Sequence, residues 1–519
     1  MPGPASSNKS PQLSFHEDDS RAWAIIACAL FLVRIMPWTL AELWHDEILT
    51  LQYFVFGGED SSLLGVFRNY SMANNHFLNS ALYWWWVRFL DFSFSEHILR
   101  WPSIFFGFAS ILLTVFHWRK FIGPRMAALM AMVFAISPVF GAFAYQVRGY
   151  SLAMFLSLWA MSGLLELLYG DARRGQYWLC LSCFLLPLVM PSAAMLGASL
   201  SLFLFWHFAS RGRGFAGSLG LALPSFVATA LSSLYYVSIW EQFVAASRSA
   251  GGWPSSWLCA GNLALGFAAH LGPLVFLLLA LFAIRLLRLF SRRSNRLLTG
   301  ARLLLCSVLP IAALLLLRLG GRAPFPRVFL VYLPSFSLAA ALMARPLPFI
   351  RRQRLMYLIV FVLLSGCLVE RYCSSLSQRQ VLDGASPQNL LQQYYRNASD
   401  NRDSVAFMRG NGFIGNSLVI VNEWDAPSFR YYWQLSNLPM QALFVSNLMP
   451  EDFWLNPEFA QYRLLVQARN ESEASQMFAK AGYRGPFHVA HKSELRQLYV
   501  IGYGDKNRSE HFEFAGDRQ

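Results

Sequence analysis

Two short polar clusters interrupt a chain that is otherwise largely apolar. They are His45-Asp46-Glu47, directly after the first long apolar run, and Asn74-Asn75-His76, further along the same loop. Ionisable groups at the edge of a bilayer are costly to keep unless they bind or react with something. We therefore predict that the two clusters are walls of one reactive site.

The adjacent carboxylates Asp46 and Glu47 offer general-base chemistry. On a helix, neighbouring side chains diverge by about 100°, so we expect only one of the two to face the reacting atoms. Desolvation near lipid favours the neutral form of a carboxylate, which suits it to accept a proton. Two other interpretations stay open. The pair could cap an interfacial helix that begins at Asp46, or His45, Asp46 and His76 could bind a divalent metal ion, although their spacing matches no ligand motif.

Three arginines are predicted to lie where an apolar span meets the same outer surface: Arg100, Arg148 and Arg327. A guanidinium group can hold a phosphate through two parallel hydrogen bonds, so together they predict a site for a lipid phosphate. The alternatives for each arginine are contact with the bilayer headgroups or an ion pair with Asp46 or Glu47.

Apolar spans must position these residues. Of 519 residues, 55% are hydrophobic and 14% are charged, whereas about a quarter of the residues of a soluble protein are charged. The sequence therefore predicts a polytopic α-helical membrane protein with about eleven transmembrane helices. The expected spans are 22–43, 98–118, 126–144, 150–169, 178–191, 193–209, 216–239, 263–284, 303–319, 328–344 and 355–369.

The placement of arginine predicts the orientation. The formal charge of +14 does not indicate a nucleic-acid partner, because most arginines lie in short loops between spans, at alternate connections. Such loops face the cytoplasm. Residues 1–21 are then a disordered cytoplasmic tail, and both polar clusters fall in a long outer loop, 44–97. Membrane lipids are the expected surroundings.

The chain after residue 369 changes character. Strand-like runs at 418–421, 464–466 and 498–501 alternate with helix-like runs at 426–435 and 472–481. This pattern predicts a small extracytoplasmic α/β domain over 370–519, beside a transmembrane catalytic domain over 22–369.

In their order along these spans, five motifs resemble the GT-C class of membrane glycosyltransferases. The resemblance is to the bacterial branch of the protein O-mannosyltransferase and lipid A aminoarabinose-transferase type. The motifs are Trp44-His45-Asp46-Glu47, Asn74-Asn75-His76 leading into Leu82-Tyr83, Leu99-Arg100-Trp101-Pro102-Ser103, Arg148-Gly149-Tyr150-Ser151-Leu152 and Pro326-Arg327-Val328. Where the family often has His-Pro-Pro, this chain has His76-Phe77-Leu78.

The resemblance implies a sugar donor carried on a polyprenyl phosphate, transfer with inversion, and a bacterial inner membrane. It assigns the base to Asp46 and a supporting role to Glu47. It carries contact with the donor phosphate over to Arg148 and Arg327. Beside the resemblance, we also predict that His76, Asn75, Arg100 and Tyr150 bind donor or acceptor. No cofactor is implied with certainty, and a divalent metal ion is possible. The acceptor is a protein, a lipid or a polysaccharide.

Two other classes of function remain open. The first class is a flippase, transporter or ligase of lipid-linked glycans. Transporters place ionisable residues near the bilayer midplane. Inside its expected spans, this chain has only Glu166 and His270 as notable polar groups. A non-catalytic surface or assembly protein is the other, but it would leave the polar clusters and the outer arginines without a role.

Overall fold

The structure is a computed structural model. It describes residues 17–39, 42–43, 45–56, 62–72, 75–90, 95–249, 255–271, 295–319, 323–344, 401–410, 417–421, 426–435, 444–445, 463–468, 470–480, 486–492 and 497–501. The first helix begins at Glu17, so residues 17–21 of the predicted tail are helical. The predicted span 355–369 lies outside the described residues.

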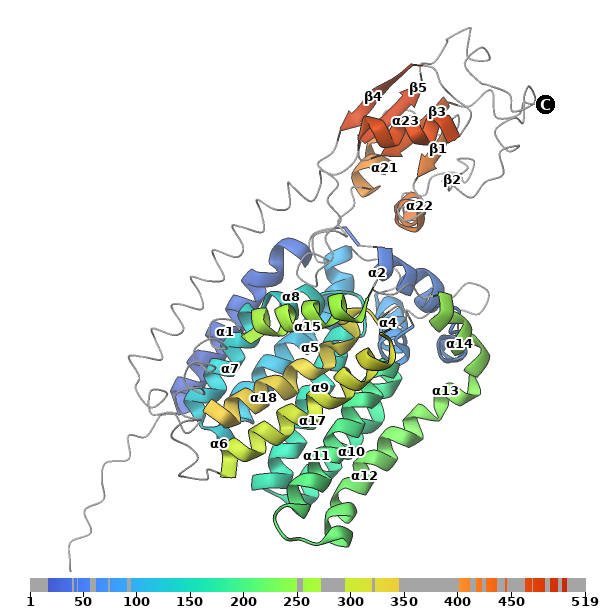
Figure 1. The fold of residues 1–519 in the computed structure, drawn as a ribbon. Helices are drawn as coiled ribbons and strands as arrows, with labels where there is room; N and C mark the ends of the chain where they lie inside the picture. The colour runs from blue at the N-terminus through green and yellow to red at the C-terminus, as the bar shows by residue number, and fades with distance from the viewer. Residues whose placement is uncertain are drawn as a thin grey trace, which may run out of the picture.

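Most of the described chain is a bundle of long helices (Figure 1). Its long members are α1 (Glu17–Thr39), α5 (Glu96–Phe116), α7 (Pro124–Ile136), α9 (Tyr150–Tyr169), α10 (Ala172–Val189), α11 (Ala194–Ala209), α12 (Phe215–Ser233), α15 (Ser256–Leu271), α17 (Asn295–Leu317) and α18 (Leu333–Ala344). Its short members are α2 (His45–Thr50), η1 (Leu51–Val55), α3 (Leu63–Arg68), α4 (Phe77–Phe89), α6 (Arg119–Ile122), α8 (Pro138–Ala144), η2 (Pro191–Ala193), α13 (Tyr235–Ser238), α14 (Trp240–Ser249) and η3 (Pro326–Tyr332).

Helix α9 is the core of the bundle. It packs against α5, α10 and α18, and most of its side chains are buried. Gly163 permits the close approach of α10, because a Cβ atom there would lie 2.8 Å from the backbone nitrogen of Leu179. The hydroxyls of Ser157 and Ser162 donate to carbonyls one turn earlier, so these polar groups are satisfied within an apolar helix.

The part of the chain that the structure describes has the helices of an integral membrane protein. Six of them are long and apolar enough to cross a membrane, or seven if α7 and α8, bent by 64° at Ser137, form one broken span. The expected count of about eleven is therefore not confirmed. Helix α1 is not among the six, and the second half of the expected span 263–284 lies outside the described residues.

The C-terminal α/β unit, described within 401–501, is built on a mixed five-stranded sheet of order β2-β1-β3-β5-β4. Strands β1 (Ser417–Val421), β2 (Phe444–Val445) and β3 (Arg463–Ala468) are parallel, and β4 (Phe487–Lys492) and β5 (Gln497–Ile501) add antiparallel pairs. Its helices are α21 (Asn401–Gly410), α22 (Ala426–Leu435) and α23 (Glu471–Lys480). Within the described residues, the five strand-like and helix-like runs noted in the sequence adopt the expected structure.

Candidate active site

Asp46 lies at the centre of a cluster that gathers three distant parts of the chain. It is the second residue of α2, and its Oδ2 atom is 2.5 Å from Nη1 of Arg148 and 3.1 Å from Nη1 of Arg327. Arg148 lies in the turn before α9, and Arg327 is the second residue of η3. The structure thus brings the predicted base and two predicted phosphate-binding arginines together, in the ion pairs that the sequence left open as an alternative.

The turn that carries Arg148 is anchored to α5. The hydroxyl of Ser103 donates to the carbonyl of Gln146 over 2.5 Å. The guanidinium group of Arg148 is almost fully buried and donates to the hydroxyl of Tyr150 over 3.3 Å. A buried guanidinium held from several sides is preorganised, so little side-chain freedom is lost when it binds an anion.

His76 also contacts Arg148. Its Nδ1 atom lies 2.9 Å from the carbonyl of Val189, and its Nε2 atom lies 3.1 Å from Nη2 of Arg148. A carbonyl only accepts, so Nδ1 carries the proton and Nε2 accepts from the guanidinium. Burial, and next the charge of Arg148, lowers the pKa of His76 to about 3. His76 is therefore a neutral group that orients Arg148, and Gly149 leaves room for its ring, because a Cβ atom there would lie 2.8 Å from it.

This lowered pKa gives a testable dependence of stability on pH. The unfolded chain takes up a proton on His76 near pH 6.5, whereas the folded protein does so only near pH 3. The contribution of this residue is therefore fully present above pH 6.5 and is lost as the pH falls towards 3. We expect the difference in melting temperature between wild type and His76→Gln to shrink from pH 7 to pH 5 in detergent. A difference that stays constant over that range would contradict a neutral, buried His76.

Asn75 organises the loop beside this cluster. Its Nδ2 atom donates to the carbonyls of Val66 and Asn69 over 2.9 and 2.6 Å, and its Oδ1 atom accepts from Ser80 over 2.8 Å. The side chain is buried, so its evident task is to hold the loop. Asn74 and the side chain of His45 lie outside what the structure describes.

Glu47 faces away from Asp46 and forms a second, closed ion pair. Its two carboxylate oxygens accept from Nε and Nη2 of Arg100 over 3.2 and 2.8 Å, and Oε1 also accepts from the backbone of Val147 over 2.8 Å. Arg100 donates further to the carbonyls of Trp38, Thr39 and Glu42. Arg100 does not line the cavity described next. It is paired with Glu47 instead.

A cavity of about 900 Å³ lies beside Arg148 and Arg327. Of the predicted substrate-binding residues, His76, Asn75, Arg148, Tyr150 and Arg327 line it, and Arg100 does not. Arg248 and Arg318 line it too, and the sequence reasoning missed them. Arg248 fell in the expected outer loop 240–262, whereas Arg318 fell at the end of the expected span 303–319.

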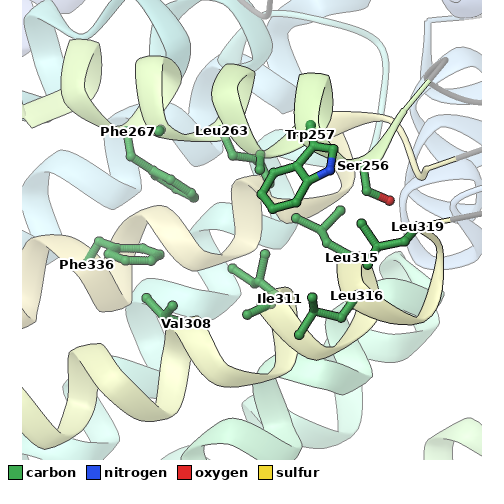
Figure 2. Close-up of a pocket in the computed structure, with 13 residues that line it drawn as sticks. Ser256, Trp257, Leu263, Phe267, Val308, Ile311, Leu315, Leu316, Leu319 and Phe336 are labelled. Carbon is green, nitrogen blue, oxygen red and sulfur yellow. The ribbon is translucent and has the colours of Figure 1, made fainter.

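A second, apolar pocket of about 460 Å³ lies between α15, α17 and α18. Figure 2 shows Trp257 and Leu263 of α15 facing Leu315 of α17 across it, with Phe336 of α18 at one end. The end of α17 separates the two spaces. Leu314 and Arg318 line the arginine-lined cavity, whereas Leu315, Leu316 and Leu319 line the apolar pocket.

Metal binding finds no support in the described side chains. They contain no group of three or more histidine, cysteine, aspartate or glutamate residues placed to hold a metal ion. Of the three residues in that hypothesis, His45 has a side chain outside the described part of the chain. Asp46 pairs with Arg148 and Arg327, and Nε2 of His76 lies 3.1 Å from Nη2 of Arg148.

Taken together, the described helices have the fold of the GT-C membrane glycosyltransferases, which confirms the fold expected from the five motifs. The structure is similar to that of ArnT from Cupriavidus metallidurans, both without ligand and bound to undecaprenyl phosphate. Each likeness has a TM-score of 0.55 and 12% sequence identity, and covers 93% of this chain and 98% of the other.

A weaker likeness is to the oligosaccharyltransferase AglB from Archaeoglobus fulgidus, in complex with an inhibitory peptide and a dolichol-phosphate. Its TM-score is 0.45 at 11% identity, and it covers 93% of this chain and 74% of the other. No model of a protein family matches the sequence. No curated protein matches it either.

Proposed function

We propose that this protein is an inverting glycosyltransferase that moves a sugar from a polyprenyl-phosphate donor to an acceptor hydroxyl on the outer face of a membrane. The observation that carries the proposal is the pairing of Asp46 with Arg148 and Arg327 beside a cavity of about 900 Å³ into which further arginines also face. The ArnT structure of the same fold is bound to undecaprenyl phosphate, which supports a lipid-phosphate ligand here.

The donor phosphate and Asp46 compete for the same two guanidinium groups. When the phosphate binds them by charge-assisted hydrogen bonds, the carboxylate is released to accept the proton of the acceptor hydroxyl. That oxygen then attacks the anomeric carbon from the side opposite the phosphate. Arg148 and Arg327 stabilise the charge that develops on the departing polyprenyl phosphate, while Glu47 and Arg100 hold α2 in place.

The apolar pocket is suited to the isoprenoid chain of such a donor. It lies on the other side of the end of α17 from the arginine-lined cavity, so one lipid could place its phosphate in one space and its hydrocarbon in the other. Burial of a hydrocarbon chain gains about 0.8 kcal/mol for each methylene group, which makes the tail a substantial source of binding energy.

In this proposal, the N-terminus is cytoplasmic, whereas the loop with Asp46 and the C-terminal unit face the extracytoplasmic side of a bacterial inner membrane. A transfer assay in detergent tests the function. We expect purified protein to move labelled sugar from a polyprenyl phosphate to material of a cell-envelope fraction. A transporter needs a closed compartment and a transferase does not, so activity that appears only in sealed vesicles, as movement across the bilayer, would contradict the proposal.

Arg327 gives the sharpest test of donor binding. Its loss removes one of the two guanidinium groups that pair with Asp46. A hydrogen bond to a charged group contributes about 1.5–3 kcal/mol. We expect Arg327→Ala to weaken the binding of polyprenyl phosphate by about 10- to 100-fold. Arg211→Ala, in the exposed turn after α11, is the control and should bind normally. Equal affinities for the two variants would move the phosphate site elsewhere.

A further inference from the structure

The segment that leads into α2 is held by the C-terminal α/β unit. Glu42 accepts hydrogen bonds from the backbone of Asn401, Arg402 and Asp403, over 2.9, 2.8 and 3.4 Å. These are the first amides of the ten-residue helix α21, which have no acceptor within their own helix. A side chain four residues before Asp46 thus caps a helix of the other unit.

A second hydrogen bond lies one residue closer to the site. The hydroxyl of Tyr432, on α22, accepts from the backbone nitrogen of Leu43 over 2.8 Å. Tyr432 is 3% exposed, and burial raises its pKa well above the ordinary value, so the phenol stays neutral. This hydroxyl is therefore the buried hydrogen-bond acceptor of the Leu43 amide.

One hydrophobic cluster continues across the junction. It contains Leu43, Ile48 and Leu51 from the loop, together with Met408 of α21 and Phe429 of α22. Figure 1 shows α21 and α22 on the side of the C-terminal unit that faces α2. Arg402 and Glu96 add an ion pair of 2.9 Å between α21 and α5.

Helix α2 (His45–Thr50) continues directly into η1 (Leu51–Val55), and a helical segment of this length is too short to be stable without tertiary contacts. Glu47 ties it to the bundle through Arg100. The segment just before it is tied to the C-terminal unit through Glu42 and Leu43. Asp46 lies between these two attachments.

We propose that the C-terminal unit positions the catalytic carboxylate: Tyr432 and Glu42 are positioning residues that fix where α2 begins and hence where Asp46 points. The inference rests on the proposed function for its catalytic meaning. It assigns the unit a task in every turnover, in addition to any contact that it makes with an acceptor.

Tyr432→Phe removes only the hydroxyl that Leu43 uses. We expect kcat for transfer to fall about fivefold, the effect of one neutral hydrogen bond, while the KM for the donor stays unchanged, because Arg148 and Arg327 are untouched. Hydrogen–deuterium exchange of the full-length protein in detergent should show faster exchange at Leu43. The control is Tyr499→Phe, the same change in strand β5 of the same unit, where the ring packs on Phe487; we expect wild-type kcat and exchange.

Glu42→Gln is a second variant, in case Tyr432→Phe folds poorly. It keeps an oxygen acceptor but removes the charge, so the amides of Asn401 and Arg402 should exchange faster and kcat should again fall at constant donor KM. If both variants match wild type in exchange and in kcat, the inference is overturned, while an inactive Asp46→Asn would leave the proposed function standing. If the wild type itself transfers no sugar, the exchange at Leu43 alone decides whether the C-terminal unit holds this segment.

Discussion

Replacing Asp46 with asparagine is expected to lower the rate of sugar transfer by about 10²- to 10⁴-fold, the usual contribution of a general base. The amide keeps the shape of the side chain but cannot take the proton of the acceptor. The variant should bind polyprenyl phosphate at least as tightly as wild type. The reason is that Arg148 and Arg327 no longer pair with a carboxylate at position 46. The phosphate then binds the two guanidinium groups without competition from that carboxylate.

The two readouts separate this account from its alternatives. Transfer is measured with labelled donor in detergent, and binding with polyprenyl phosphate alone. If Asp46 were only a structural partner of the arginines, Asp46→Asn would lower binding and transfer together. Transfer at the wild-type rate would end the assignment of Asp46 as the base.

Replacing Arg100 with methionine is expected to cost about 3–5 kcal/mol of stability, because it leaves the buried carboxylate of Glu47 without its partner. Both side chains are almost fully buried, at 1% and 0% exposure. Arg100 also donates to three backbone carbonyls between α1 and α2, so the segment that leads into α2 should loosen as well.

Thermal unfolding in detergent tests this second prediction. The double variant Arg100→Met/Glu47→Gln is the matched comparison, since removing the charges of both partners is far less costly than stranding one. We expect the single variant to have the lower melting temperature. A single variant that melts with wild type would mean that the Glu47–Arg100 pair does not hold α2.

The sequence was sufficient for the parts of the site that depend on local pattern and span order. Each of these residues was predicted to lie at a boundary between a span and an outer loop: Asp46, Arg148 and Arg327. In a bundle of membrane spans, such boundaries lie at the same depth, so the three residues could be expected close together. Strands β1, β3 and β5 were equally evident, because short apolar runs bounded by polar residues are a local signal.

The sequence could not give what depends on side-chain direction. Arg100 and Arg148 both lie at a predicted boundary between a span and a loop, yet only Arg148 lines the cavity. The side chains of Asp46 and Glu47 diverge on their helix, so Asp46 pairs with Arg148 and Glu47 pairs with Arg100. The break at Ser137, which turns α8 by 64° from α7, was hidden in one apolar run. The contact of Tyr432 with Leu43 joins residues 389 positions apart, and no local pattern encodes it.

The most direct measurement is a structure of the purified protein with a polyprenyl phosphate bound. The account predicts the phosphate within hydrogen-bond distance of both Arg148 and Arg327, with the carboxylate of Asp46 released from at least one of them and the isoprenoid chain along the end of α17. A phosphate bound away from both arginines, or one bound there with the two Asp46 ion pairs intact, would contradict it.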